Sequence, residues 1–300
     1  MREKARIHAV DGVSLKIKYG ETLSLVGESG SGKTTTGRCI LGEIPQSDGK
    51  IVFMGHDLSD ARKEDIRKLR RHMGVVFQDP YSSLNPRWKV GRIISEPVAI
   101  HKTVPLSERE EKVYELLSLV GLEPHHALRY PHEFSGGQVQ RVAIARALAA
   151  SPKFIVADEP VAALDVSVKA GILNLMNELK DKFELSYLLI SHDLSAVRYS
   201  SDQTAVMYVG KIMEFAPTTE IFSEPRHPYT RALMSAVPIP DPTLDRKPII
   251  LPGDVPSPID PAPICRFYSR CYEKTSKCRG EAPPLAEIDK GHFVACYNME

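Results

Sequence analysis

Short apolar runs alternate with amphipathic or charged segments along most of the chain, a pattern typical of layered α/β proteins. The runs that predict strands are residues 21–26, 51–53, 74–77, 154–157 and 187–190. The segments that predict helices are residues 35–41, 60–72, 107–120, 139–150 and 167–182. A looser alternation over residues 7–18 predicts an edge strand, and residues 203–216 predict a hairpin that turns at Gly210. The expected fold class is therefore α/β.

The composition changes between residues 79 and 150, where the sequence favours helices and turns over strands. Prolines interrupt the first part of this stretch, and Ser107 followed by Glu110 predicts the N-terminal cap of a helix. We expect a helical insertion between strands of the core. Further on, the proline-rich residues 238–263 predict an extended linker.

The chain has 300 residues, enough for a large buried core, and a net charge of +1. Near-neutral charge without long runs of one sign predicts no nucleic-acid partner. No apolar run approaches the ~20 residues that span a bilayer, and the N-terminus lacks the apolar core of a secretory signal. These features predict a soluble, cytoplasmic protein. Its five cysteines are then expected to be thiols or metal ligands rather than disulfides.

Residues 27–34 match the phosphate-binding pattern G-x-x-x-x-G-K-[ST] at every fixed position. A predicted strand precedes them and a predicted helix follows, so that N–H groups and the helix dipole converge on bound phosphate. Lys33 is expected to neutralise the β- and γ-phosphates, and the Thr34 hydroxyl to ligate Mg²⁺. The alternative, a Gly/Ser-rich linker before an ordinary helix, leaves the lysine and threonine in register unexplained. The residues expected to bind nucleotide here are Gly27, Glu28, Ser29, Gly30, Ser31, Gly32, Lys33, Thr34 and Thr35.

A second Ser/Gly-rich turn precedes the helix predicted over residues 139–150. It consists of Ser135, Gly136, Gly137 and Gln138. A turn of this kind can bind an anion, and it can equally be an N-terminal cap with a glycine hinge. Because one triphosphate already has a cradle at residues 27–34, we interpret the second as a site for the γ-phosphate bound by a neighbouring subunit. This hypothesis predicts a dimer.

Polar side chains follow three of the predicted strands at the points where the strands end. They are Gln78, the pair Asp158-Glu159, and His192. Open α/β sheets bind ligands at the carboxyl ends of their strands, so we expect these side chains to form one site. Asp158 can hold Mg²⁺ directly or through water, and Glu159 can accept a proton from the water that attacks the γ-phosphate. His192 can bind a γ-phosphate oxygen or orient that water.

Each of these residues also has a structural interpretation. Gln78 can simply cap its strand, the acidic pair can form a solvated turn, and a single histidine is usually structural. Asp165 can be a helix N-cap or a carboxylate at an interface, and the sequence does not choose between the two.

Taken in chain order, these motifs resemble those of the ATP-binding subunit of an ABC transporter, over nearly the whole chain. By this resemblance the motifs are the Walker A loop at residues 27–34, the Q-loop at Gln78, the signature motif at residues 135–138, the Walker B pair at Asp158-Glu159, the D-loop at Asp165 and the H-loop at His192. The resemblance implies a P-loop NTPase of the ABC cassette type, with a RecA-like core, a mixed sheet and a helical subdomain at about residues 79–150.

The same resemblance implies ATP and Mg²⁺ as cofactors. Thr34, Gln78 and Asp158 would lie at the metal, and Glu159, His192 and Gln78 would act in catalysis. The family forms a head-to-tail dimer of homologous ATPase subunits, in which each signature motif, from Ser135 to Gln138, completes the partner's ATP site.

Longer strings at residues 77–86, 130–134 and 158–167 are similar to oligopeptide/dipeptide importer ATPases, especially the F-type subunit. This implies an ATPase at the cytoplasmic face of the membrane that powers peptide import with two transmembrane permease subunits and, indirectly, an extracytoplasmic solute-binding protein. The alternatives are the same motor for oligosaccharide or nickel import, and a soluble ABC ATPase acting in repair or translation. A third is a cluster-carrying regulatory subunit with a degenerate site.

The domain boundaries expected are residues 1–220 for the ATP-binding domain and 221–300 for a C-terminal extension of the oligopeptide/dipeptide-transporter type. The extension contains Cys265, Cys271, Cys278 and Cys296, and four thiols are sufficient to bind a metal ion or an iron–sulfur cluster. Their spacing is unlike a paired C-x-x-C zinc ribbon, and the family resemblance favours a [4Fe–4S] cluster over zinc. The alternative is ordinary reduced thiols that stabilise a small lobe.

Overall fold

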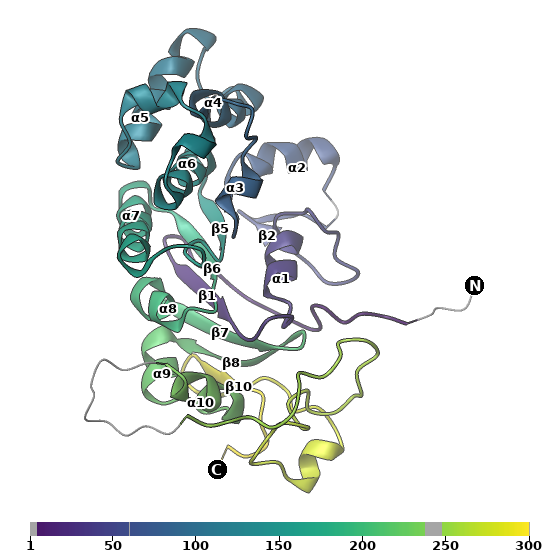
Figure 1. Ribbon diagram of the computed structural model, residues 1–300. Coiled ribbons are helices and arrows are strands. Elements are labelled where there is room, and N and C mark those ends of the chain that lie inside the picture. The colour runs from purple at the N-terminus through teal and green to yellow at the C-terminus, as the bar shows by residue number, and fades with distance from the viewer. Residues whose placement is uncertain (1–4, 60, 238–247, 300) are drawn as a thin grey trace. The chain divides into compact units, whose positions relative to one another are not determined.

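The computed structural model of the protein describes residues 5–59, 61–237 and 248–299. The described chain divides into two compact units (Figure 1). The first unit contains the described residues of Met1–Lys16, Thr22–Thr36 and Ser191–Glu300, and the second contains those of Ile17–Glu21 and Gly37–Ile190. Helix α1 (Lys33–Ile40) begins in the first unit and ends in the second.

The first unit is built on a mixed sheet with the strand order β1-β7-β8-β10-β9. These strands are β1 (Thr22–Val26), β7 (Gln203–Tyr208), β8 (Lys211–Pro217), β9 (Ala286–Asp289) and β10 (His292–Val294). β1 runs parallel to β7, and the later pairs are antiparallel. β1 is buried at every position, as its continuous apolar run predicted. The hairpin predicted over residues 203–216 is confirmed as β7 and β8.

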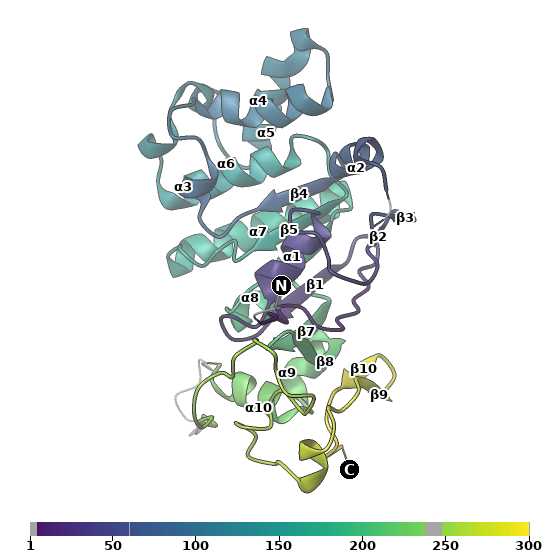
Figure 2. The ribbon, with the colours of Figure 1, turned by 90° about the vertical axis from the view of Figure 1, so that its right-hand side faces the viewer.

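Three helices and an aromatic core complete the first unit. The helices are α8 (Leu194–Ser200), α9 (Thr218–Ser223) and α10 (Pro228–Ser235), followed by a 3₁₀ turn at Ser276–Arg279. α9 and α10 pack against β8 (Figure 2). In the core, the rings of Tyr208, Tyr229 and Phe267 lie 4.7–5.3 Å apart and are fully buried. The C-terminal residues therefore share one hydrophobic core with the strands of this unit.

The second unit contains three parallel strands, β4 (Met73–Val76), β5 (Phe154–Asp158) and β6 (Ser186–Ile190). β5 and β6 are almost completely buried, as expected for strands covered on both faces. The helices α2 (Lys63–Arg70) and α7 (Val166–Phe183) and a short hairpin of β2 (Val52–Phe53) and β3 (His56–Asp57) belong to the same unit. These elements confirm the strands and helices predicted from the apolar runs of this region.

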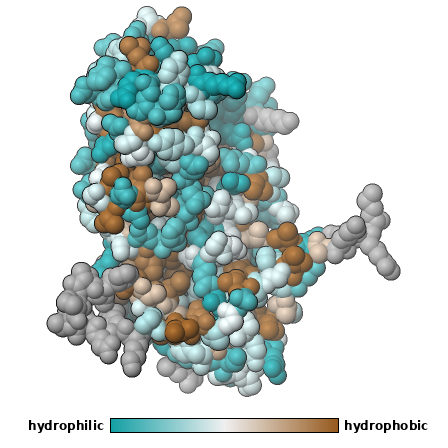
Figure 3. All heavy atoms as spheres, in the orientation of Figure 1, coloured by the Kyte–Doolittle hydropathy of each residue, from teal (hydrophilic) through white to brown (hydrophobic). Residues whose placement is uncertain are grey.

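Between β4 and β5 the chain forms a group of helices. They are α3 (Pro80–Ser83), α4 (Val90–His101), α5 (Arg109–Leu119) and α6 (Gly136–Leu148), with 3₁₀ turns at Leu106–Glu108, Pro124–Leu128 and Pro131–Glu133. Helices α4, α5 and α6 pack on one another through buried aliphatic side chains such as Ile94, Leu117 and Ile144. On the face shown in Figure 3, hydrophilic side chains predominate over α4 and α5. Among the helices that the structure describes, none combines the length and apolarity needed to cross a bilayer.

Two local expectations are wrong. Residues 7–18 form no strand in the described structure, although exposure alternates over residues 11–18; a single bridge joins Ile7 to Ile259. Ser107 does not cap α5, because it lies inside the 3₁₀ turn at Leu106–Glu108 and Glu108 occupies the cap position. Residues 238–247 of the predicted linker lie outside the described residues, and residues 248–258 form no helix or strand.

Candidate nucleotide-binding site

Strand β1 ends at Val26 and leads directly into the predicted phosphate loop, which curls back before α1 begins at Lys33. Gly27 and Gly32 have φ angles of +148° and +106°. A Cβ atom at Gly27 would stand 2.1 Å from the carbonyl oxygen of Met207, and one at Gly32 would stand 2.1 Å from that of Ala9. The curl is therefore compatible only with glycine at these two positions.

The ammonium group of Lys33 is folded into this curl. It donates hydrogen bonds to the carbonyl oxygens of Gly27 at 2.7 Å and Glu28 at 2.9 Å, and to the Ser31 hydroxyl at 3.3 Å. The lysine is only 6% exposed. A positive charge is thus held at the N-terminus of α1, where the helix dipole also favours an anion, and the arrangement suits phosphate binding.

The segment that carries His192 lies in the same unit as the loop. The backbone N–H of Ser191 donates to the carbonyl oxygen of Leu25 in β1, at 3.3 Å. Asp193 then caps α8, because its carboxylate accepts hydrogen bonds from the N–H groups of Ser195 and Ala196 at 3.1 and 3.3 Å. Position 192 is thereby held between a bond to β1 and the start of a helix.

Gln78 and Glu159, the polar residues predicted at the ends of β4 and β5, meet in the second unit. The Gln78 Nε2 group donates to Glu159 Oε2 at 2.7 Å. The backbone N–H of Glu159 donates to the carbonyl oxygen of Ile190 at 2.8 Å. Asp158 pairs in register with Ile190, the last residue of β6. Glu159 has a φ of +48°, a strained conformation for a residue with a side chain and one that often marks a functional position.

The Ser/Gly turn forms the N-terminus of α6. The Ser135 hydroxyl accepts a hydrogen bond from the Gln138 N–H at 3.4 Å, and the Gln138 side chain accepts one from the Ser135 N–H at 3.1 Å. This is a capping box, so the turn forms the N-cap of α6. Ser135 remains exposed. A Cβ at Gly137 would stand 2.5 Å from a methyl carbon of Val168, so glycine permits the close approach of α6 and α7.

The predicted site residues fall into two groups. Residues 27–35 and His192 belong to the first unit, and Gln78, residues 135–138, Asp158-Glu159 and Asp165 belong to the second. Asp165 occupies the N-cap position of α7, yet its exposed carboxylate makes no capping hydrogen bond within the described chain. Asp158 is the last residue of β5, and Gln78 and His192 follow β4 and β6 within two residues, as the apolar runs predicted.

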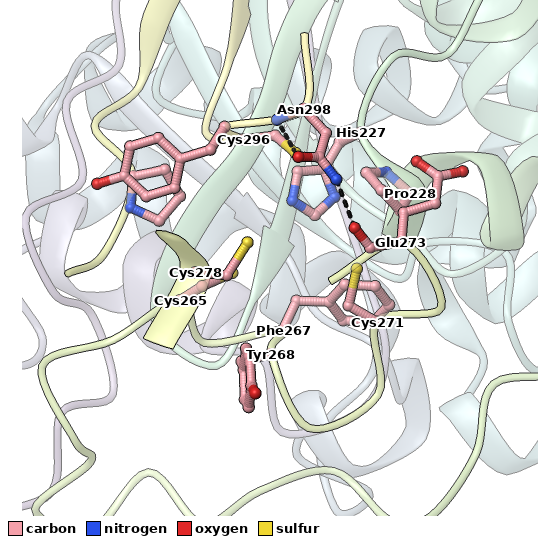
Figure 4. Close-up of a pocket in the computed structure, with 12 residues that line it drawn as sticks. His227, Pro228, Cys265, Phe267, Tyr268, Cys271, Glu273, Cys278, Cys296 and Asn298 are labelled. Atoms are coloured by element: carbon pink, nitrogen blue, oxygen red, sulfur yellow. Dashed lines mark hydrogen bonds between the residues drawn. The ribbon is translucent and has the colours of Figure 1, made fainter. Parts of the chain in front are cut away.

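The four C-terminal cysteines line one pocket, together with His227 and other residues (Figure 4). Burial raises the pKa of the Cys265 thiol to about 11, and burial also raises the pKa values of Cys271 and Cys296, with further contributions from the neighbouring thiols. The cavity measures only about 10 Å³. Within the described part of the chain, no three histidine, cysteine or acidic side chains are arranged to hold a metal ion. The expected cluster thus has its donors in one place but not in a ligating arrangement.

Sequence reasoning missed two residues at the phosphate loop. Tyr229 and Arg270 both contact Glu28, from 201 and 242 positions further along the chain. No local sequence pattern around Tyr229 or Arg270 indicates such a contact. Next to Arg270, the only feature that suggests a function is the candidate metal ligand Cys271.

A buried strand that ends in a glycine curl, with a lysine folded into it at a helix N-terminus, defines a phosphate-loop nucleotide-binding protein. Comparison with protein families narrows this class. The ABC transporter family model matches residues 10–162, and the model of the oligopeptide/dipeptide transporter C-terminal region matches residues 213–278. The chain belongs to the ABC transporter family and is an ABC-type ATPase.

Relatives match over almost the entire chain. The oligopeptide transport ATP-binding protein AppF of Bacillus subtilis (strain 168) is 49% identical, over 99% of this chain and 91% of the relative. The dipeptide transport ATP-binding protein DppF of Haemophilus influenzae is 46% identical, over 98% and 90%. A solved structure, the dimeric post-hydrolysis state of the ATP-binding cassette MJ0796 bound to ADP and Pi, is 30% identical with a TM-score of 0.64, covering 70% of this chain and 90% of that one. These similarities confirm the ABC cassette fold.

Proposed function

We propose that the chain is the ATP-hydrolysing subunit that powers the import of oligopeptides or dipeptides through a membrane ABC transporter. The observation that carries this proposal is the similarity, at 46–49% identity over nearly the full chain, to proteins named for oligopeptide and dipeptide transport. The match of residues 213–278 to the oligopeptide/dipeptide transporter C-terminal region points the same way. The alternative cargoes, oligosaccharide and nickel, have no comparable support among these relatives.

In this proposal the phosphate loop binds the triphosphate of ATP. Backbone N–H groups of residues 27–34, other than that of Glu28, which donates to the Tyr229 hydroxyl, would hold the β- and γ-phosphates together with the ammonium of Lys33. Thr34, Gln78 and Asp158 carry side-chain oxygen atoms, the donors that Mg²⁺ prefers, and are the residues that would hold the ion in this proposal. When bound, Mg²⁺ neutralises phosphate charge.

Hydrolysis is assigned to the strand-end residues. Glu159 would take a proton from the attacking water, and its hydrogen bond from Gln78, 2.7 Å long, would orient the carboxylate for this task. His192 would bind a γ-phosphate oxygen or orient the water. Most of the acceleration would come from positioning and charge neutralisation, as in other phosphoryl transfers.

The complete site is proposed to need a second ATPase subunit. Ser135 is exposed at the start of α6, where it and the N–H groups of Gly136 and Gly137 could reach the γ-phosphate held by a head-to-tail partner, with Asp165 at the same interface. Two permease subunits would form the membrane passage, and an extracytoplasmic binding protein would deliver the solute. The chain would then work at the cytoplasmic face of the membrane.

The substitution Glu159→Gln tests the catalytic assignment. We expect the variant to bind ATP normally and to lose turnover by about 10²–10⁴-fold, the usual contribution of a general base. Glu178→Gln, which changes an exposed carboxylate on α7, is the matched control and should keep full turnover. Unchanged turnover in Glu159→Gln would remove this carboxylate from the mechanism. Two results together would favour the alternative of a soluble ABC ATPase: ATPase activity that does not associate with membranes, and ATPase activity that peptide does not stimulate in the presence of the permease subunits.

We propose separately that the cysteine pocket accepts a metal centre, with a [4Fe–4S] cluster favoured over zinc. The support is the convergence of Cys265, Cys271, Cys278 and Cys296 on one pocket, since thiolates are the ligands of both centres. Because the cavity is about the size of one water molecule, loading would require the side chains to turn. Iron, sulfide and zinc analysis of anaerobically purified protein tests this. The metal should be lost in Cys278→Ser and kept in Cys39→Ser, and protein without either metal would leave ordinary thiols.

A further inference from the structure

The first turn of the phosphate loop is held from outside by the C-terminal extension. The backbone N–H of Glu28 donates to the Tyr229 hydroxyl at 2.9 Å, and Arg270 Nη1 donates to the Glu28 carboxylate at 2.6 Å. All three residues belong to the first unit. One residue of the loop is therefore fixed through both its backbone and its side chain.

Both fastening side chains are themselves immobilised. Tyr229 is fully buried, with its ring 4.7 Å from that of Tyr208 and 5.3 Å from that of Phe267. Arg270 is 8% exposed, and it also donates to the carbonyl oxygen of Pro252 at 3.3 Å. Burial opposes the charge of Arg270, but its hydrogen bonds to Glu28 and Tyr208 raise its pKa above the ordinary value. With side chains 10% and 28% exposed, the Arg270–Glu28 ion pair is mostly shielded from water, so salt screens it less than a surface pair.

Glu28 also holds the ammonium group of Lys33, the positive charge of the loop. The carbonyl oxygen of Glu28 accepts the hydrogen bond from Lys33 Nζ at 2.9 Å. Tyr229 and Arg270 act on the N–H and the carboxylate of the same residue. A shift of Glu28 would therefore move the acceptor that positions Lys33. Because the loop is rich in glycine, its own sequence provides little resistance to such a shift.

We propose that Arg270 and Tyr229 are positioning residues for nucleotide binding, so that the C-terminal extension sets the affinity of the phosphate loop. The inference rests on the proposed ATPase function and assigns a regulatory task to a region outside the loop. Its physical basis is preorganisation: apparent affinity falls in proportion to the fraction of molecules whose loop has the binding conformation. Neither residue needs to touch the nucleotide.

The test is a titration of the full chain with a fluorescent ATP analogue, together with steady-state ATPase kinetics. Arg270→Met should weaken nucleotide binding about tenfold and raise KM similarly, with kcat changed by less than about twofold. Arg270→Lys should restore part of the affinity, because it keeps the charge but not the planar fork. Arg231→Met is the matched control, because Arg231 pairs with Glu273 at 3.1 Å in the same extension without contacting the loop. It should bind nucleotide as the unaltered chain does.

A double-mutant cycle separates positioning from general destabilisation. In a Glu28→Gln background, Arg270→Met should have little further effect, because the ion pair is already broken. Tyr229→Phe keeps the buried ring but removes the hydroxyl, and it should weaken nucleotide binding as well. It serves as the test if Arg270→Met does not fold. Unchanged affinity in folded Arg270→Met and Tyr229→Phe, or an equal loss in Arg231→Met, would overturn the inference. An unaltered chain that binds no nucleotide would instead overturn the proposed function.

Discussion

His227 should make the first unit sensitive to acid. It stands at the N-cap of α10, where its Nδ1 atom accepts the N–H of Tyr229 at 3.0 Å, and its ring lies 5.7 Å from that of Phe267. The residue is 1% exposed. Burial lowers its pKa from 6.5 to about 3, and the nearby Arg231 acts in the same direction. The folded protein therefore keeps this imidazole neutral well into the acid range.

The direction and size of the effect follow from proton linkage. Above pH 6.5 the histidine is neutral in both the folded and the unfolded chain, so its titration takes nothing from the free energy of unfolding. As the pH falls from 6.5 towards 3, only the unfolded chain takes up the proton, and stability declines by about 1.4 kcal/mol per pH unit. At about pH 5, His227 should accordingly cost about 2 kcal/mol.

Hydrogen exchange measures this loss of stability in the first unit. Exchange of peptides from β7 and β8 is followed by mass spectrometry at about pH 7.5 and pH 5 and is corrected for intrinsic exchange rates. The comparison is with His227→Asn, which retains a capping acceptor but does not titrate. The unaltered protein should lose about 2 kcal/mol more than the variant between the two conditions. Equal losses in the two proteins would refute the reasoning.

Two further predictions concern glycine geometry and a buried hydroxyl. Gly32→Ala should abolish nucleotide binding and lower the melting temperature strongly, because its Cβ would overlap the carbonyl oxygen of Ala9. Gly30→Ala should lower the free energy of unfolding by only about 1–2 kcal/mol, the cost of its φ of +76°, since no described atom lies within 4 Å of its Cβ. Similar losses in thermal melts of the two variants would contradict this. Tyr187→Phe should leave stability unchanged or raise it by up to about 1 kcal/mol in urea unfolding, since the buried hydroxyl has no hydrogen-bond partner among the described residues. A clear loss would show that the hydroxyl is bound.

Sequence patterns are sufficient where structure depends on local chemistry. The apolar runs of β5 and β6 are buried on both faces, and a run of this kind has few other stable arrangements. The glycine and lysine spacing of the phosphate loop, and the Ser135 cap of α6, follow from backbone geometry within a few residues. These features are predictable because each depends on residues that are close together in the chain.

Patterns are insufficient where a partner far along the chain decides the outcome. Residues 11–18 alternate in exposure as a strand does. The backbone N–H groups of the predicted strand, however, bond singly to distant positions, such as His8 N–H to the Pro258 carbonyl and Asp11 N–H to the Gly210 carbonyl. Alternation indicates which way side chains point, whereas a strand also needs a continuous ladder of bonds. The contact between Glu28 and Arg270 is unpredictable from sequence patterns for the same reason.

The order in which the molecule is assembled has a consequence for its synthesis. Glu28 and Lys33 emerge early from the ribosome, whereas β7 begins at Gln203 and the groups that grip Glu28 arrive with Tyr229 and Arg270. A nascent or prematurely terminated chain would carry the nucleotide motif without its neighbours. If Tyr229 and Arg270 position the loop as proposed, the full affinity for nucleotide is reached only after residues 229–270 have been synthesised and have folded onto β7 and β8.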